Sequence, residues 1–297
     1  MKKLFGLFLL ALAFLAPSAA NAASRFWVGG TGTWDASDTT HWSATQGGAG
    51  GQSVPGTSDD VTFDGSSGGG TVTVNATITV ISLTMSAFTG TLDFATNNNN
   101  ITLSGNSPFT NTGSGTRTLN MGNGTWTLSG ATASFSQSGA TNLTFNANSS
   151  IISYTGTGAK RFITGNSRTY SAVTVVGATS GSLTIQGGTS VTIGTLTISA
   201  PNRIISSSGV TTIITTLTNI SASVSTPVLF TSDSAVNGVS TISSANNFTC
   251  DYCGVTGMTF SGGGTFAATN SYSFGQNSGI TITAPTVGTG GGRIIGG

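Results

Sequence analysis

The sequence has very few charged side chains. It contains no glutamate, and Lys, Arg and Asp together make up 6% of the 297 residues. Solubility must therefore rest on hydroxyl and amide groups, and roughly fifty threonines and forty serines supply far more of them than average composition would. The formal net charge of +1 gives no basic surface of the kind that nucleic-acid binding needs, so we expect no nucleic-acid partner.

Groups that carry out catalysis are equally scarce. A glycan-cleaving site needs clustered carboxylates, or a carboxylate beside a base, for acid–base chemistry. Convergence of Asp93 with Lys160, Arg161 or Arg168 in one groove would indicate an enzyme. The charged residues of the central part of the chain are Asp93, Arg117, Lys160, Arg161, Arg168 and Arg203. They are too sparse to predict such a groove. We therefore predict no catalytic residue, no cofactor and no enzymatic activity.

Metal ligands are also few. The chain has one histidine, His41, which leaves a zinc site short of ligands. Asp59, Asp60 and Asp64 could together bind Ca²⁺, but aspartates in such Gly- and Ser-rich segments more often make turns. The sequence therefore predicts no metal site.

The two cysteines, Cys250 and Cys253, form a C-x-x-C pair. In an exported protein such a pair favours a local disulfide. On a single extended strand, however, residues i and i+3 point to opposite faces and cannot bond without a turn or bulge. A local disulfide, two buried unpaired thiols and a redox or metal role remain the alternatives.

The N-terminus has the pattern of a secretory signal peptide. Lys2 and Lys3 precede the apolar run 4–16, which is too short for a membrane anchor, and Ala20-Asn21-Ala22 forms an A-x-A cleavage site. We predict Sec-type export to the cell surface or medium, with residues 1–22 removed and no membrane span afterwards. The mature chain is close to neutral.

Short segments of alternating polar and apolar residues fill the rest of the chain. β-Branched residues recur with period 2, Gly, Asn and Ser clusters separate the segments, and no 3.6-residue period is present. This pattern predicts an all-β fold. Representative segments are 71–74, 78–85, 90–94, 100–105, 125–130, 142–145, 171–176, 182–187, 191–199 and 210–220.

Similar segments return about every 20 to 25 residues, a period typical of solenoids. We predict a single right-handed parallel β-solenoid (β-helix) with inward Val, Ile and Leu and outward Thr, Ser and Asn. The asparagine run 97–100 is expected at a corner, where left-handed backbone and amide ladders are tolerated. Because the repeats are irregular, a pair of packed antiparallel sheets is the alternative fold.

Both ends of the chain differ from the middle in composition, which is typical of solenoid caps. The predicted organisation is a signal peptide (1–22), a Trp/Gly-rich N-terminal cap (23–70), the solenoid (71–245), a C-terminal cap (246–284) and a flexible Gly-rich tail (285–297). Trp27, Trp34 and Trp42 either plug the open end or stack on sugars, and their Gly-rich spacing favours the plug.

The opening FWVGGTGTWDASDTTHWS, followed by VPGTSDDVTFDG, resembles the W-x-G-G-x-G-x-W start of β-helical surface proteins of bacteria and phages, which are autotransporter-passenger-like or adhesin-like. The segment 227–283 resembles a motif that closes such helices. The resemblance implies a fold and a surface location, and it carries no catalytic residues. We expect the chain to depart from autotransporters, since no membrane barrel follows the solenoid before Gly297.

We therefore expect an exported structural or adhesive surface protein without catalytic activity, which binds surface glycans or associates with itself. A glycan-binding or glycan-cleaving β-helix, including a phage-fibre-like role, is the first alternative. An ice-binding solenoid is the second, because T-x-T repeats can form a flat hydroxyl array. That array needs strict register between turns, which the variable repeat spacing does not predict.

Overall fold

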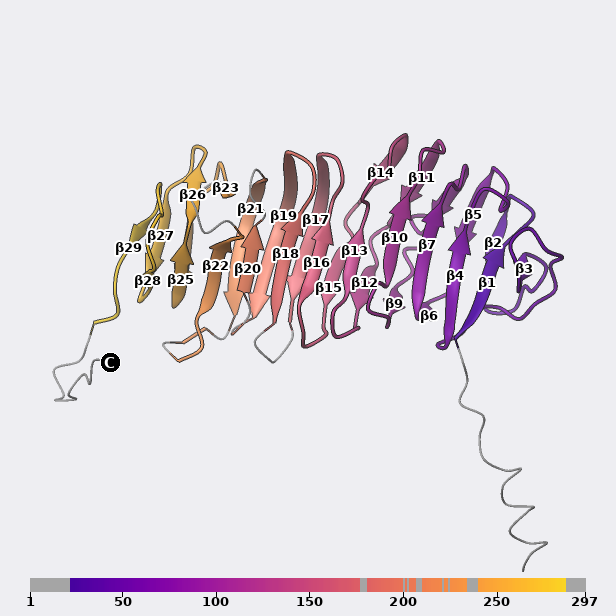
Figure 1. Ribbon diagram of the computed structural model, residues 1–297, viewed down its shortest axis with the longest axis horizontal. Helices are drawn as coiled ribbons and strands as arrows, with labels where there is room; N and C mark the ends of the chain where they lie inside the picture. Colours follow the sequence, from indigo (N-terminus) through magenta and orange to yellow (C-terminus); the bar gives the residue numbers. More distant parts are fainter. Residues whose placement is uncertain are drawn as a thin grey trace, which may run out of the picture.

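The structure, a computed structural model, describes residues 22–286 except for 177–180, 200, 202, 207–209, 221, 224 and 234–239. The predicted signal peptide, apart from its last residue, and residues 287–297 of the predicted tail lie outside the described residues. The described chain is all-β, with no helix, and forms an elongated stack of parallel strands (Figure 1). The predicted β-solenoid is confirmed.

Four sheets build the described part of the solenoid, and consecutive strands of the chain pass from one sheet to the next except for β3 and β4, which belong to the same sheet. Sheet A has 12 strands: β28 (Tyr272–Ser273), β25 (Cys253–Thr256), β22 (Val228–Ser232), β20 (Arg203–Ser206), β18 (Ser182–Gln186), β16 (Lys160–Ile163), β13 (Ser134–Ser136), β10 (Phe109–Thr112), β7 (Ser82–Ser86), β4 (Asp59–Phe63), β1 (Ala23–Trp27) and β3 (Trp42–Ser43). Sheet B has five: β14 (Leu143–Asn146), β11 (Arg117–Asn120), β8 (Thr91–Asp93), β5 (Thr71–Val74) and β2 (Gly32–Trp34).

The remaining strands form sheets C and D. Sheet C has nine: β26 (Met258–Ser261), β23 (Ser240–Ser243), β21 (Thr211–Ile220), β19 (Ser190–Ser199), β17 (Arg168–Val175), β15 (Ile151–Tyr154), β12 (Thr125–Leu128), β9 (Ile101–Leu103) and β6 (Ile78–Val80). Sheet D has three: β24 (Phe248–Asp251), β27 (Phe266–Thr269) and β29 (Thr281–Ile282).

Parallel pairing between successive turns excludes the alternative of two packed antiparallel sheets. The pairs between the named strands are parallel except β1 with β3. In sheet A, for example, Phe109 of β10 lies opposite Leu83 of the preceding turn and Phe135 of the following turn. Each turn therefore hydrogen-bonds to its two neighbours, as a solenoid requires.

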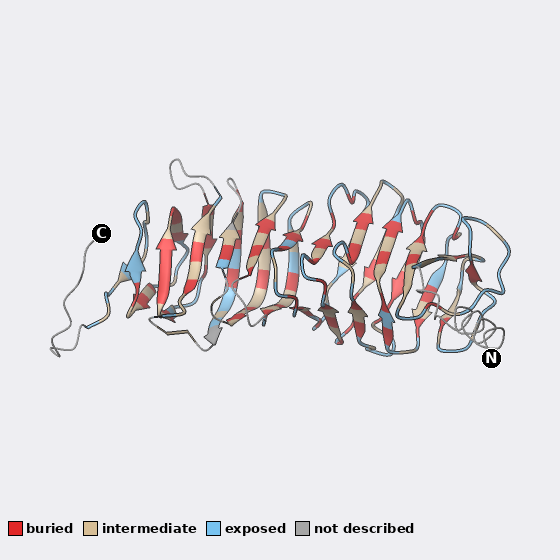
Figure 2. Cartoon of the chain, turned by 60° about the horizontal axis from the view of Figure 1, so that its bottom comes forward, coloured by how far each residue is buried: buried red, intermediate tan, exposed pale blue. Residues whose placement is uncertain are grey.

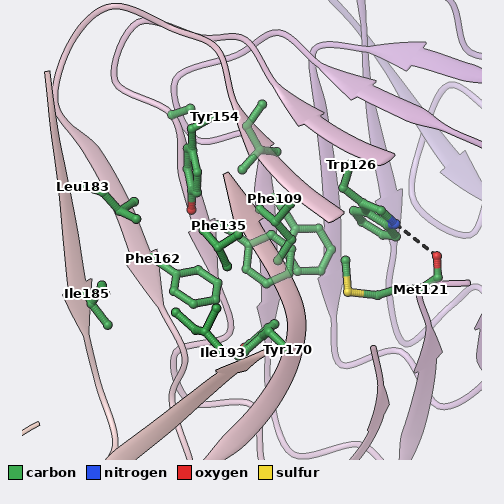
Figure 3. Close-up of a cluster of buried hydrophobic side chains, with 14 of the residues drawn as sticks. Phe109, Met121, Trp126, Phe135, Tyr154, Phe162, Tyr170, Leu183, Ile185 and Ile193 are labelled. Atoms are coloured by element: carbon green, nitrogen blue, oxygen red, sulfur yellow. Dashed lines mark hydrogen bonds between the residues drawn. The ribbon is translucent and has the colours of Figure 1, made fainter. Parts of the chain in front are cut away.

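The alternation in the sequence becomes alternation of burial along each strand, which Figure 2 shows as red and lighter bands. Inward side chains of sheet A form a continuous column that changes from aliphatic to aromatic and back, and all its members are fully buried: Val61, Leu83, Phe109, Phe135, Phe162 and Ile185. The rings of Phe109 and Phe135 stack at 4.4 Å (Figure 3). Stacked inward columns are therefore the core of the rod.

The predicted asparagine corner is confirmed. Asn98 has a positive φ of 54°, and its Oδ1 accepts the backbone N–H of Asn123 one turn later, at 2.8 Å. Asn123 repeats the contact with Ser149 in the next turn, at 3.1 Å. The small amide side chain tolerates the left-handed backbone and satisfies the N–H groups at a bend that leaves the sheet ladders.

The parallel ladder extends beyond the predicted range 71–245 at both ends. Ala23 of β1 already lies opposite Asp59 of β4, and β25 to β29 continue the stack as far as Ile282. The segments predicted as caps are therefore turns of the solenoid with aromatic cores. At the N-terminal end, β3 pairs antiparallel with β1.

Sheet B stops halfway along the rod. Its last strand is β14. In the following turns the chain runs instead as long strands of sheet C, which are β17, β19 and β21 (Figure 1). The repeat shortens at this point. Asn120 and Asn146, one turn apart, are 26 residues apart, whereas Ser167 and Ser190 are 23 apart. From this turn on, the described chain forms no separate strand of sheet B.

Candidate functional site

The three tryptophans of the opening motif are buried together in the first turn. Trp27 lies on β1, Trp34 on β2 and Trp42 on β3, and none of them is exposed to solvent. The Trp42 ring meets those of Trp27 and Trp34 edge-on, at 5.1 and 5.0 Å between centroids. A sugar-stacking platform needs a free aromatic face. These residues offer none, so they form the aromatic core of this end.

The cysteines form the local disulfide, Cys250–Cys253. The obstacle expected for one extended strand does not arise, because β24 ends at Asp251 and β25 begins at Cys253. Tyr252, between them, has a positive φ of 54°. This corner turns both cysteine side chains into the core, where they are buried. The bond therefore joins sheets D and A at a bend.

The aspartates considered as possible calcium ligands have separate local partners. Asp59 lies 4.0 Å from the Arg25 guanidinium and accepts the N–H of Gly56, while Asp64 accepts the N–H of Ser66 at 2.7 Å. The described residues contain no group of three His, Cys or Asp side chains placed to hold a metal ion. They also contain no helix long and apolar enough to cross a bilayer.

The charged residues of the central turns lie apart. Asp93 ends β8 and accepts hydrogen bonds from Asn120 Nδ2 and from the N–H of Ala95. Lys160 is fully buried on β16, where its ammonium donates to Gly158 O at 2.9 Å and burial lowers its pKa. Arg161 points outward to Gln186. Each has a different partner, so the structure does not bring Asp93 together with Lys160, Arg161 or Arg168.

A groove lies where sheet B stops. It consists of two adjoining hollows of about 770 and 680 Å³ that share Phe145 and Thr169. One wall is β14 and the other is the first half of β17. Thr, Ser and Asn side chains supply most of the lining, with Arg168 as its charged member: Thr116, Asn142, Thr144, Asn146, Asn148, Asn166, Ser167, Ser171, Ser190, Thr192, Thr195, Thr215 and Thr216.

Arg168 is held in the groove by neutral groups. Its Nε donates to Gln137 Oε1 at 2.6 Å and its Nη2 to Ala140 O at 2.9 Å, while its Cζ lies 6.0 Å from the centre of the Phe145 ring. Burial lowers its pKa below the usual value. The described ion pairs do not include Arg168, so the groove carries a partly desolvated positive charge.

A second arginine, which the sequence offered only as one of the sparse central charges, lies behind this site. Arg117 of β11 is 1% exposed and donates to Asn111 Oδ1 at 2.7 Å and to the carbonyl oxygens of Gly113 and Gly115. Burial lowers its pKa most, and repulsion by Arg168 lowers it further. Arg117 lies two residues before the inward Leu119, so the alternation along β11 places it on the inward face, and this is the signal in the sequence that marks it as buried.

The outer face of sheet C carries hydroxyl groups in strict register. Seven residues, one on each successive turn, face one another across the ladder: Thr79, Thr102, Thr127, Ser153, Thr174, Thr197 and Thr218. The expectation that irregular spacing would prevent such register is wrong. The extra residues lie in the corners, while the strands between them keep their alignment.

These features define an all-β parallel solenoid with an aromatic first turn, a row of hydroxyl groups on one face and a groove on another. Comparison with protein-family models, with curated proteins and with solved structures finds no match to this chain.

Proposed function

We propose that the chain is an exported, non-catalytic β-solenoid that serves as a structural or adhesive element of a bacterial surface or a phage fibre. The observation that carries this proposal is the continuous inward core with nearly uncharged Thr, Ser and Asn faces outside. Such a rod is stiff along its length and has an extended surface for contact. The separate partners of Asp93, Lys160 and Arg161 support a non-catalytic role.

Localisation tests this function. We expect C-terminally tagged protein in the cell-surface, medium or virion fraction, and a variant lacking residues 1–22 in the cytoplasm, because the predicted signal directs export. Fractionation followed by immunoblotting measures both. Full-length protein retained in the cytoplasm, with its N-terminus uncleaved by mass spectrometry, would contradict the proposal.

A second candidate function, ice binding, is favoured by the hydroxyl row on sheet C. Adjacent strands of a sheet lie about 4.8 Å apart, so the seven hydroxyls form a regular line. A second line runs parallel to the first on the same face, two residues earlier in each strand. It has hydroxyl groups at three positions and apolar groups at two: Thr125, Ile151, Ala172, Thr195 and Thr216. Ordered hydroxyl and methyl groups on a face without charges can organise water into a lattice.

Thermal hysteresis of the purified mature protein tests this candidate. We expect a freezing-point depression that Thr174→Lys, in the middle of the row, abolishes. Thr84→Lys, an outward threonine on sheet A, is the matched control and should leave the depression unchanged. Absence of hysteresis and of ice-recrystallisation inhibition in the parent protein would eliminate ice binding and leave the structural proposal intact.

A further inference from the structure

Two strand edges without partners face the groove. β14 pairs with β11 on one side, where Asn142 O and Asn146 O accept backbone hydrogen bonds from Arg117 and Met121. Since peptide groups alternate in direction along a strand, those of Leu143 and Phe145 point away from β11 and toward the groove. Across the groove, residues 168–170 of β17 pair with β19 and with no other described strand.

The floor of the groove is incompletely covered core. Leu143 and Phe145 of β14 continue the inward columns of sheet B, yet both are partly exposed, whereas Leu92 and Leu119 of the preceding turns are fully buried. In those preceding turns the next strand of sheet B covers the inward leucine. Here the Phe145 ring reaches across to Tyr170, at 5.0 Å between centroids, and no strand lies between them in the described chain. One additional strand beside β14 would cover Leu143 and Phe145.

The positive charge of the groove favours an occupant that carries an acidic group. Arg168 lines it, Arg117 lies behind it, and the residues that line the two hollows include no aspartate. A bound segment with a carboxylate near Arg168 would therefore gain a charge-assisted hydrogen bond without repulsion from a neighbouring acid. A neutral glycan has no negative charge to pair with Arg168 and no row of peptide groups to match the strand edge.

We propose that the groove binds an extended peptide segment of a partner protein by strand addition. The peptide backbone pairs with the open edge at Leu143 and Phe145, and alternate apolar side chains cover these residues. An acidic side chain or C-terminal carboxylate lies against Arg168. In strand addition, main-chain hydrogen bonds supply affinity and pockets for alternate side chains supply specificity. The inference does not depend on where the protein is located.

A synthetic peptide tests the backbone pairing. The probe is a fluorescein-labelled seven-residue peptide of alternating threonine and valine that ends in aspartate and has an amidated C-terminus, so that the aspartate side chain is its one carboxylate. We expect saturable binding by fluorescence anisotropy to the mature protein, and slower amide hydrogen exchange in fragments covering 142–147. Two control peptides are N-methylated at alternate residues, one in each phase. At least one should lose binding, because methylation removes the donors of one strand edge.

The charge contribution is tested by paired substitutions. Arg168→Gln should weaken the aspartate peptide about 5-fold, the range for a partly exposed ion pair, and should leave an otherwise identical asparagine peptide unchanged. Arg161→Gln, an outward arginine of sheet A, is the matched control and should change neither affinity. If Arg168→Gln does not fold, the aspartate and asparagine peptides compared on the unaltered protein measure the same contribution.

Three results would overturn the proposal. The first is no peptide binding, in which case Arg168 protects a bare edge from aggregation. The second is equal binding of both N-methylated peptides and the parent peptide. The third is unchanged hydrogen exchange at 142–147, which would place the contact elsewhere. A glycan-array signal that Thr169→Trp removes, with no peptide binding, would assign the groove to a carbohydrate.

Discussion

Replacing Trp34 by alanine is expected to lower the free energy of unfolding by about 3–5 kcal/mol, the range for emptying a fully buried large aromatic site. Trp34 is not exposed, and its ring lies 5.0 Å from Trp42 and 6.0 Å from Phe63. The truncation would leave a cavity in the first described turn. Chemical denaturation of the mature protein measures the loss.

Trp34→Phe is the matched control. The Trp34 Nε1 is buried and has no hydrogen-bond partner among the described residues, so phenylalanine removes an unpaired donor while it keeps most of the ring contacts. We expect a change within about 1 kcal/mol. Unchanged stability of Trp34→Ala, together with loss of a glycan-array signal, would contradict burial of this residue and restore the sugar-stacking role.

Replacing Phe135 by alanine is expected to cost about 3–5 kcal/mol as well, but in the middle of the rod. Its ring stacks on Phe109 and lies 5.8 Å from Phe162 and 6.1 Å from Tyr170 (Figure 3). Because each turn of a solenoid contacts only its neighbours, a gap here weakens the coupling between the two halves. Calorimetry should therefore show a lower transition temperature and a broadened or divided transition.

Ser134→Ala, an outward position of the same strand, should change stability by less than about 0.5 kcal/mol. Phe135→Leu, which keeps much of the volume, should fall between the two. A single sharp transition for Phe135→Ala at the parent temperature would mean that the stacked aromatic column does not hold the turns together.

Much of the fold follows from local patterns. Period-2 alternation predicted which side chains of 125–128 and 182–186 face inward, since side chains of a strand alternate between its faces. Recurrence of such segments predicted the parallel stack. The asparagines at 97–100 were predicted at a corner because amide side chains tolerate left-handed backbone and satisfy its N–H groups.

Other features depend on how distant segments align. The segment 142–145 alternates like every other strand, and nothing in it indicates that its far edge lacks a partner. The groove exists because the next turn runs into β17 without forming a separate strand. The hydroxyl row of sheet C likewise depends on pairings such as Thr102 with Thr127, which irregular spacing concealed.

The sequence by itself determined the all-β class, the direction of alternate side chains and the scarcity of charge, because these depend on residue type and on neighbours along the chain. Only the tertiary structure decided that the tryptophans are core, that Cys250 and Cys253 meet at a bend and that sheet B ends in a groove beside Arg168. Those outcomes depend on the register between turns, and corner lengths, which carry little pattern of their own, set that register.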